Sequence, residues 1–211
     1  MKKNHRAMGF LLAVAAVLLL TQACAKGPAM TVNRDTVAPG GSVTRGGKEL
    51  ALLGTPLAVG SPLPAVDLVD AMSKEDVDLS TVRGQVLLVS LVPSLDTRVC
   101  EEQTHYLGEE GDRLPPTVRR ITISRDTPFA QERFAREAKL TDLTYLSDYK
   151  EGAFGMATGL LVDNLRLLAR GILLVDKKGV VRYLQIVPAL GELPDMETAF
   201  ARARLLDAEP D

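Results

Sequence analysis

The strongest constraint on the fold is the apolar run QVLLVSLVP at residues 85–93. Between Gln85 and Pro93 its only polar side chain is that of Ser90. A strand with one solvent-exposed face would alternate apolar and polar residues, whereas this run is apolar at consecutive positions. It therefore predicts a strand covered on both faces, as the central strands of α/β sheets are. Pro93 lacks a backbone N–H and marks the end of that strand.

Strand and helix patterns alternate after this central strand. A second strand is expected at residues 117–126, and a helix is expected on either side of it, one around residues 101–114 and one from about residue 126. Asp126 and Thr127 are the candidate N-caps of the later helix. Residues 143–160 predict a short strand and then a loop interrupted by glycines.

Turn signals predict two hairpins at opposite ends of the chain. One turn lies at Gly46 and Gly47, and the other at Asp176–Gly179 between two apolar runs. A helix from about Pro194 closes the chain. Together these patterns predict an α/β domain with a mixed central sheet flanked by helices.

The first residues have the pattern of an export signal. Lys2, Lys3 and Arg6 precede an uncharged apolar run at residues 7–20, which is too short to span a bilayer comfortably as a helix. Cys24 directly follows this stretch, so residues 1–23 are assigned to a lipoprotein-type signal peptide and Cys24 to the acylated N-terminus.

The alternative is ordinary signal cleavage after Ala25, because Ala23-Cys24-Ala25 has small residues at the required positions. Acylation predicts an exported protein on the periplasmic side, and the absence of Asp at position 25 favours the outer membrane. Cleavage after Ala25 predicts a soluble periplasmic or secreted protein. Residues 24–42, which are small, polar and Pro/Gly-containing, predict a flexible tether to a domain at 43–211.

Composition excludes several classes of function. The formal net charge of −2 and the absence of Trp argue against nucleic acid as a partner. His105 is the only histidine after the signal peptide, and the chain has no C-x-x-C, so a multi-histidine metal site and a disulfide oxidoreductase motif are both ruled out. We therefore expect neither a metal nor an organic cofactor.

Cys100 remains as the sharpest feature. If Cys24 is acylated or removed, Cys100 is the only free thiol, and an unpaired cysteine in an exported protein indicates reactivity or intermolecular pairing. Near the start of the expected helix it lies at the positive end of the helix dipole, an environment that favours a thiolate. Thr97 places a hydroxyl on the same turn, and Pro93 can shape a lid that excludes water.

Pro93, Thr97 and Cys100 form the pattern P-x-x-x-T-x-x-C, and on these residues the chain resembles the thiol peroxidase branch of the peroxiredoxins. The resemblance covers about residues 43–206. VTRGG…LLGTPLAVGSPLPAVDLVD is similar to the N-terminal hairpin and entry of that family, PSLDTRVC to its active-site loop, and RDTPFAQERF to the following helix. FGMATG, LLARGILLVDKKGVV and VP…LPDMETAFA are similar to its C-terminal half in the same order.

The resemblance implies a thioredoxin-like fold with an N-terminal β-hairpin, a homodimer, and an active-site arginine at Arg170. It implies that the Cys100 thiolate attacks the O–O bond of hydrogen peroxide or an organic hydroperoxide, while Thr97 and Arg170 hold the peroxide oxygens. Glu101 or Gln103 is expected to orient Arg170. The alternative for Arg170 is a surface charge at the start of a strand.

The chain departs from the family at one position. Many members resolve the oxidised thiol with a second cysteine, and the matching position here is Ala135. An external thiol reductant, a thioredoxin-like protein or a small thiol, must then reduce the Cys100 sulfenic acid in a one-cysteine cycle. A non-catalytic thioredoxin-fold lipoprotein, acting as a binding or scaffold module, is the rival interpretation. The joint presence of Pro93, Thr97, Cys100 and Arg170 favours the enzyme.

Overall fold

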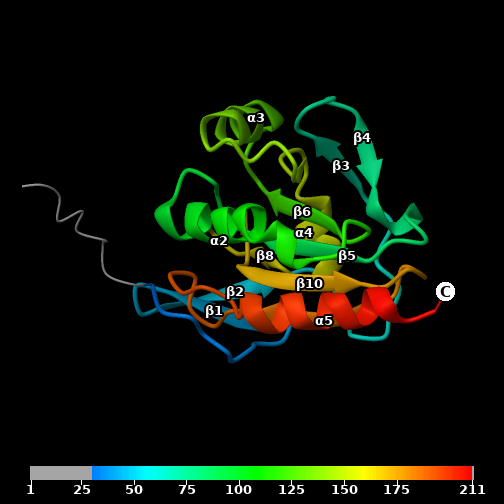
Figure 1. Cartoon of the computed structure of the whole chain (residues 1–211). Coiled ribbons are helices and arrows are strands. Elements are labelled where there is room, and N and C mark those ends of the chain that lie inside the picture. Colours follow the sequence, from blue (N-terminus) through cyan, green and yellow to red (C-terminus); the bar gives the residue numbers. More distant parts are fainter. Residues whose placement is uncertain (1–29, 211) are drawn as a thin grey trace, which may run out of the picture.

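The computed structural model describes residues 30–210, so the expected signal peptide and Cys24 lie outside the described residues. Its centre is a seven-stranded sheet with the order β11-β10-β5-β6-β7-β3-β4 (Figure 1). The strands are β3 (Asp67–Asp70), β4 (Asp76–Asp78), β5 (Leu87–Leu91), β6 (Arg119–Ser124), β7 (Thr144–Ser147), β10 (Gly171–Val175) and β11 (Val181–Ile186). β5, β6 and β7 are parallel and the other neighbours are antiparallel, so the predicted mixed sheet is confirmed.

The apolar run that constrained the fold forms β5, which lies between β10 and β6 and is buried at all five residues. Leu87, Val89 and Leu91 belong to the core on one face of the sheet, and Leu88 belongs to the core on the other face. This alternation between two apolar cores explains why the run has no polar period. The prediction of a central strand is confirmed.

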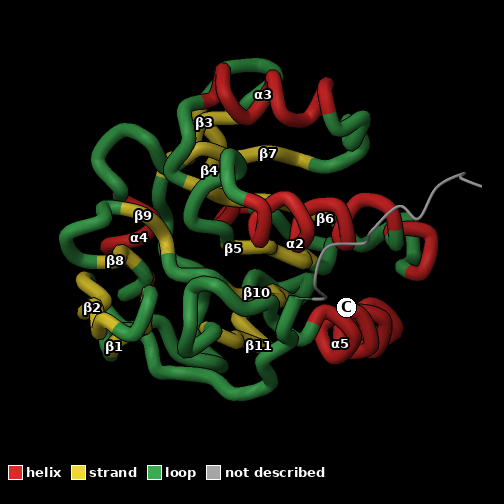
Figure 2. Tube along the Cα trace, turned by 90° about the vertical axis from the view of Figure 1, so that its left-hand side faces the viewer, coloured by secondary structure: helices red, strands yellow, loops and turns green. Residues whose placement is uncertain are grey.

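Helices cover one face of the sheet, and a smaller sheet with a short helix covers the other (Figure 2). The first group is α2 (Arg98–Glu109), α3 (Pro128–Glu137) and α5 (Met196–Ala208). α3 begins as expected, because the Thr127 hydroxyl accepts from the backbone N–H of Ala130 and Pro128 follows directly. Two 3₁₀ turns, η1 (Leu79–Thr81) and η2 (Gly111–Arg113), connect elements.

The predicted N-terminal hairpin is confirmed as β1 (Ser42–Arg45) and β2 (Lys48–Leu53). Gly46 and Gly47 have φ values of 57° and 77°, the left-handed pair that a two-residue hairpin turn requires. The hairpin continues through β8 (Leu161–Val162) into β9 (Leu167–Leu168), which gives a four-stranded sheet.

One segment differs from the sequence-based expectation. Residues 153–158, expected as a glycine-interrupted loop, form α4 (Ala153–Thr158), bounded by Gly152 and Gly159 in left-handed conformations. The buried carboxylate of Asp148 accepts hydrogen bonds from the N–H groups of Phe154 and Gly155 at the start of α4. The start of the helix is therefore stabilised by an acceptor outside it, six to seven residues before the donors.

The part of the expected tether that the structure describes is docked on the domain. Asn33 N donates to Leu193 O at 2.8 Å, Val37 N donates to Ile186 O at 3.0 Å, and Gln185 donates to Asn33 O at 2.9 Å. Small polar composition predicted flexibility here, but these residues satisfy the free edge of β11. The folded unit thus begins before the expected boundary at residue 43. None of the helices within residues 30–210 is long and apolar enough to cross a membrane.

Candidate active site

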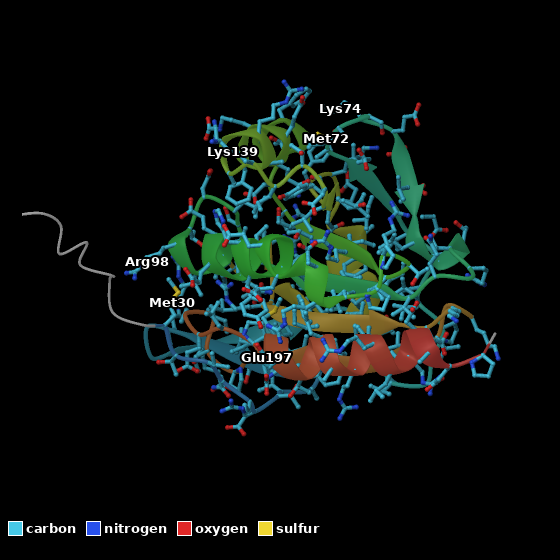
Figure 3. The ribbon with its side chains drawn as sticks, in the orientation of Figure 1. Met30, Met72, Lys74, Arg98, Lys139 and Glu197 are labelled. Atoms are coloured by element: carbon cyan, nitrogen blue, oxygen red, sulfur yellow. The ribbon has the colours of Figure 1, made fainter. Side chains whose placement is uncertain are left out.

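Cys100 lies in the first turn of α2, which begins at Arg98 at the edge of the molecule (Figure 3). Its side chain is fully buried and packs in the core between the sheet and the helices. The backbone N–H of Cys100 donates to Thr97 O at 2.9 Å, which fixes the thiol at the positive end of the helix. Within residues 30–210 it is the sole free thiol.

Thr97 is the N-cap residue of α2, but its side chain makes no capping hydrogen bond. Its hydroxyl instead lies 3.0 Å from Cys100 Sγ and 3.0 Å from Ser94 O. A hydroxyl has one proton, so it donates to one of these acceptors at a time, and its oxygen can accept a hydrogen bond while it donates to Ser94 O. The hydroxyl can therefore form a hydrogen bond with the sulfur or with a ligand beside the sulfur.

Arg170 comes from the segment between β9 and β10 and is 2% exposed, which excludes the alternative of a surface charge. Its Nη2 donates to Cys100 Sγ at 3.2 Å, and its Nε donates to Leu190 O at 2.9 Å. Within the described part of the chain no carboxylate lies in ion-pair range of this guanidinium. A buried guanidinium is costly unless its N–H groups are paired, and the sulfur of Cys100 is one of the acceptors that pair it.

Gln103 positions Arg170 from the same helix as the thiol. Its Oε1 accepts from Arg170 Nη1 at 2.8 Å, and its Nε2 donates to Ser90 Oγ at 2.8 Å on the central strand. Of the two residues expected to orient Arg170, Gln103 makes the contact, whereas Glu101 is exposed on α2. The polar Ser90 in an otherwise apolar strand is thereby explained.

Asp126 was expected to cap α3, but its carboxylate holds the loop that precedes the thiol. Oδ1 accepts from Ser94 Oγ at 2.7 Å, and Oδ2 accepts from Leu95 N at 2.7 Å and from Ser124 Oγ at 2.7 Å. The carboxylate thus spans the ends of β5 and β6. Sequence reasoning missed this role because the loop lies about thirty residues away along the chain.

A cavity of about 200 Å³ opens onto this group. Its polar lining includes Arg170, which is buried, and Thr97, which is exposed, and Pro93, which is buried directly after the central strand, lines it as well. The remaining lining is mostly leucine and valine. Arg170, which is distant in the sequence, therefore meets Pro93 and Thr97 around one space. The fully buried Cys100 lies beside this space but does not line it.

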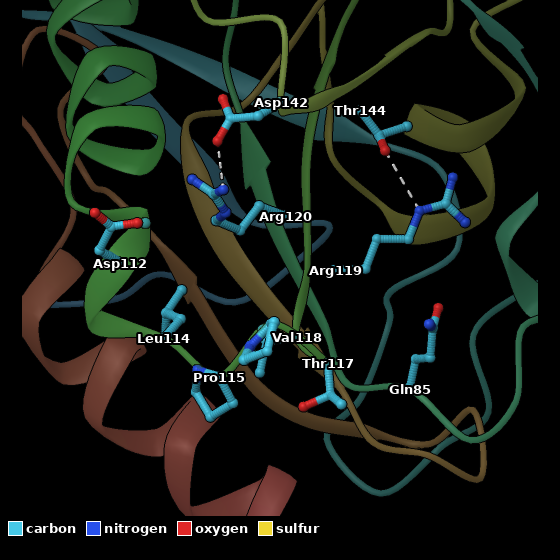
Figure 4. A pocket seen from close by; sticks show the side chains of 12 residues that line it. Gln85, Asp112, Leu114, Pro115, Thr117, Val118, Arg119, Arg120, Asp142 and Thr144 are labelled. Carbon is cyan, nitrogen blue, oxygen red and sulfur yellow. Dashed lines mark hydrogen bonds and ion pairs between the residues drawn. The ribbon is translucent and has the colours of Figure 1, made fainter.

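A larger cavity of about 800 Å³ lies at the N-terminal end of β6, which begins at Arg119 (Figure 4). Arg120 donates there to Asp142 at 2.6 Å and to the carbonyl oxygens of Leu107 and Gly108 at the end of α2. Its charge is already neutralised, and its hydrogen bonds satisfy a helix C-terminus. The contacts of Arg120 therefore have a structural explanation.

Comparison with known proteins agrees with this arrangement. The family model described as Redoxin matches residues 58–200. A thiol peroxidase from Staphylococcus saprophyticus is 39% identical over 155 residues, which is 74% of this chain and 93% of that protein. The chain belongs to the thiol peroxidase family of peroxiredoxins.

Other relatives support the same family and fold. A thiol peroxidase from Listeria innocua is 39% identical over 155 residues, covering 74% of this chain and 93% of its own. The crystal structure of a peroxiredoxin-like protein from Aquifex aeolicus superposes with a TM-score of 0.73 at 30% identity, covering 78% of this chain and 96% of that one. The expected thioredoxin-like fold with an N-terminal hairpin is therefore confirmed, and this peroxiredoxin is an oxidoreductase.

Ala135, where many family members have the resolving cysteine, is fully buried on α3 in the same core as Cys100. The side chain at that position fills space between helix and sheet. Within the described residues, no second sulfhydryl is available to Cys100.

Proposed function

We propose that this peroxiredoxin reduces hydrogen peroxide or organic hydroperoxides through Cys100. The observation that carries the proposal is the buried Arg170, whose Nη2 lies 3.2 Å from Cys100 Sγ and which has no carboxylate partner among the described residues. Such a guanidinium stabilises a thiolate in the resting enzyme and negative charge on oxygen during the reaction. A cysteine that only fills core space needs no guanidinium beside its sulfur.

The thiolate attacks one oxygen of the peroxide, the O–O bond breaks, and the other oxygen takes up a proton from solvent and leaves as water or an alcohol. Arg170 and the Thr97 hydroxyl hold the two oxygens in line with the sulfur. Pro93 closes the inner end of the cavity and keeps water from competing for their hydrogen bonds. The product is a sulfenic acid on Cys100.

The sulfenic acid is then reduced by an external thiol, because Ala135 replaces the usual resolving cysteine. A first thiol condenses with the sulfenic acid, forming a mixed disulfide and releasing water. A second thiol attacks that disulfide, regenerates Cys100 and leaves as the oxidised reductant. This one-cysteine cycle needs no metal and no organic cofactor.

Peroxide consumption by the purified protein with excess dithiothreitol tests the proposal. We expect steady turnover by the wild type and none by Cys100→Ser, with a +16 Da adduct on Cys100 when thiol is omitted. Turnover that survives in Cys100→Ser would refute the proposal. A wild-type protein that binds a partner but consumes no peroxide would support the scaffold alternative.

We further propose that the protein is exported, is acylated at Cys24 and works at the periplasmic side of the outer membrane as a homodimer. The charged, then apolar, then cysteine-containing N-terminal sequence supports this proposal. Mass spectrometry of the mature protein distinguishes acylation at Cys24 from cleavage after Ala25. Sedimentation of the protein in detergent measures the oligomeric state.

A further inference from the structure

The cavity at Cys100 has more room than hydrogen peroxide needs. Its volume of about 200 Å³ is several times the roughly 30 Å³ that one water molecule occupies in the liquid. Besides Pro93, Thr97 and Arg170, four apolar residues line the cavity: Val99, Leu165, Leu167 and Leu190. This lining accommodates a carbon chain next to the peroxide group.

Leu165 is held in the cavity wall by an unusual turn between β8 and β9. Its neighbours Asn164 and Arg166 both have left-handed backbone conformations, with φ values of 63° and 55°. Such conformations are unfavourable for residues other than glycine and persist where the surroundings enforce them. The turn is closed by a hydrogen bond of 3.0 Å from Arg166 N to Val162 O.

Arg45 is the second charged residue of this cavity, and like Arg170 it is a cation. Arg45 is exposed and Arg170 is buried, so Arg45 stands at the outer end of the space. Among residues 30–210 it has neither an ion-pair partner nor a side-chain hydrogen bond. The cavity contains no acidic side chain to balance it.

Backbone hydrogen bonds of Thr44, the residue before Arg45, tie this strand to the segment that contacts Arg170. Thr44 N donates to Pro188 O at 2.7 Å, and Leu190 N donates to Thr44 O at 2.9 Å. Leu190 O in turn accepts from Nε of Arg170. The two arginines are therefore connected through one short stretch of chain, with leucine side chains between them.

We propose that Arg45 is a specificity-determining residue that binds the carboxylate of a hydroperoxy acid. The peroxide group of this substrate lies at Arg170 and Thr97, its carbon chain contacts the leucines, and its carboxylate pairs with the Arg45 guanidinium. A guanidinium matches a carboxylate with two parallel N–H donors. The inference rests on the proposed peroxidase activity and adds the charge of the substrate to it.

A matched pair of substrates tests this assignment: a medium-chain hydroperoxy acid and its methyl ester, with hydrogen peroxide as the third substrate. The full-length wild type is compared with Arg45→Gln, under saturating dithiothreitol. Arg166→Gln is the control, because this exposed arginine lies on the neighbouring turn and does not line the cavity.

We expect the wild type to have a lower KM for the acid than for the ester, and Arg45→Gln to raise the KM of the acid about two- to fivefold without changing kcat. The ester and hydrogen peroxide should be unaffected, and Arg166→Gln should behave as the wild type. The preference for the acid should also decrease as salt is added, because the Arg45 contact is near solvent.

An unchanged ratio of acid to ester in Arg45→Gln overturns the assignment, while turnover of hydrogen peroxide by the wild type leaves the peroxidase proposal intact. Loss of all three activities in the wild type refutes the peroxidase proposal instead. A carboxylate on the reducing thiol has the same chemistry, so sulfenic acid reduction by 3-mercaptopropionate and by 2-mercaptoethanol is compared in both proteins. A defect confined to 3-mercaptopropionate would show that Arg45 binds the reductant and overturn the assignment to the hydroperoxide.

Discussion

Replacing Gln103 by leucine isolates the contribution of a positioned Arg170 to peroxide reduction. The substitution keeps a side chain of similar size in a fully buried site but removes the acceptor 2.8 Å from Arg170 Nη1. A hydrogen bond to a charged group contributes about 1.5–3 kcal/mol. If that bond aligns Arg170 in the transition state, its loss slows sulfenic acid formation about 10- to 150-fold.

The assay is a single-turnover reaction of reduced enzyme with hydrogen peroxide, quenched at set times and read by intact mass. The second-order rate constant is the quantity compared. Urea unfolding is measured in parallel, because the loss of Gln103 also leaves Ser90 Oγ without its donor and should lower the free energy of unfolding by about 1–3 kcal/mol.

Thr104→Val is the matched control. Thr104 is buried on the same helix and donates to Cys100 O at 2.8 Å, but it does not contact Arg170. We expect it to lower stability by about 1 kcal/mol while leaving the peroxide reaction unchanged. If Gln103→Leu is destabilised to a similar degree and still reacts at the wild-type rate, Gln103 only fills the core and the reasoning is wrong.

Substitutions at three further residues test other parts of the structure. Thr97→Val removes the hydroxyl 3.0 Å from Cys100 Sγ and should slow the peroxide reaction about 100-fold or more, whereas Thr97→Ser should stay near the wild type; equal rates for the two variants would exclude a role for the hydroxyl. Gly171→Ala places a Cβ 2.2 Å from Gln185 O next to Arg170, so urea unfolding should show a loss of about 1–3 kcal/mol, with a slower peroxide reaction. Arg113 and Tyr106 hold the pKa of Glu197 down at about 2, below its ordinary value of about 4.3. This contribution to stability is present above about pH 4.3 and is lost as the pH falls toward 2, so Glu197→Gln should flatten the acid side of a Tm-against-pH curve; an unchanged curve would contradict this pairing.

The sequence was sufficient for features that depend on neighbouring residues. The central strand, the two hairpins and the start of α3 at Thr127 follow from apolar period, turn residues and a cap, all of which act within a few positions. It was insufficient where a group outside the element supplied the hydrogen bond. The short helix α4 depends on Asp148, and the docked segment before residue 43 depends on β11.

By itself the sequence placed Pro93, Thr97 and Cys100 together, because a strand end and one helical turn bring residues at that spacing to the same point. The resemblance to peroxiredoxins pointed to Arg170, but the contact with Cys100 spans 70 positions of the chain. The pairing of strands in the sheet determines this contact. β10 lies antiparallel to β5 with Gly171 opposite Leu91, so the start of β10 lies beside the end of β5, where the active-site loop begins. The same register lets Gln103 reach Ser90 on one side and Arg170 on the other, because strand pairing fixes distances that local periodicity leaves open.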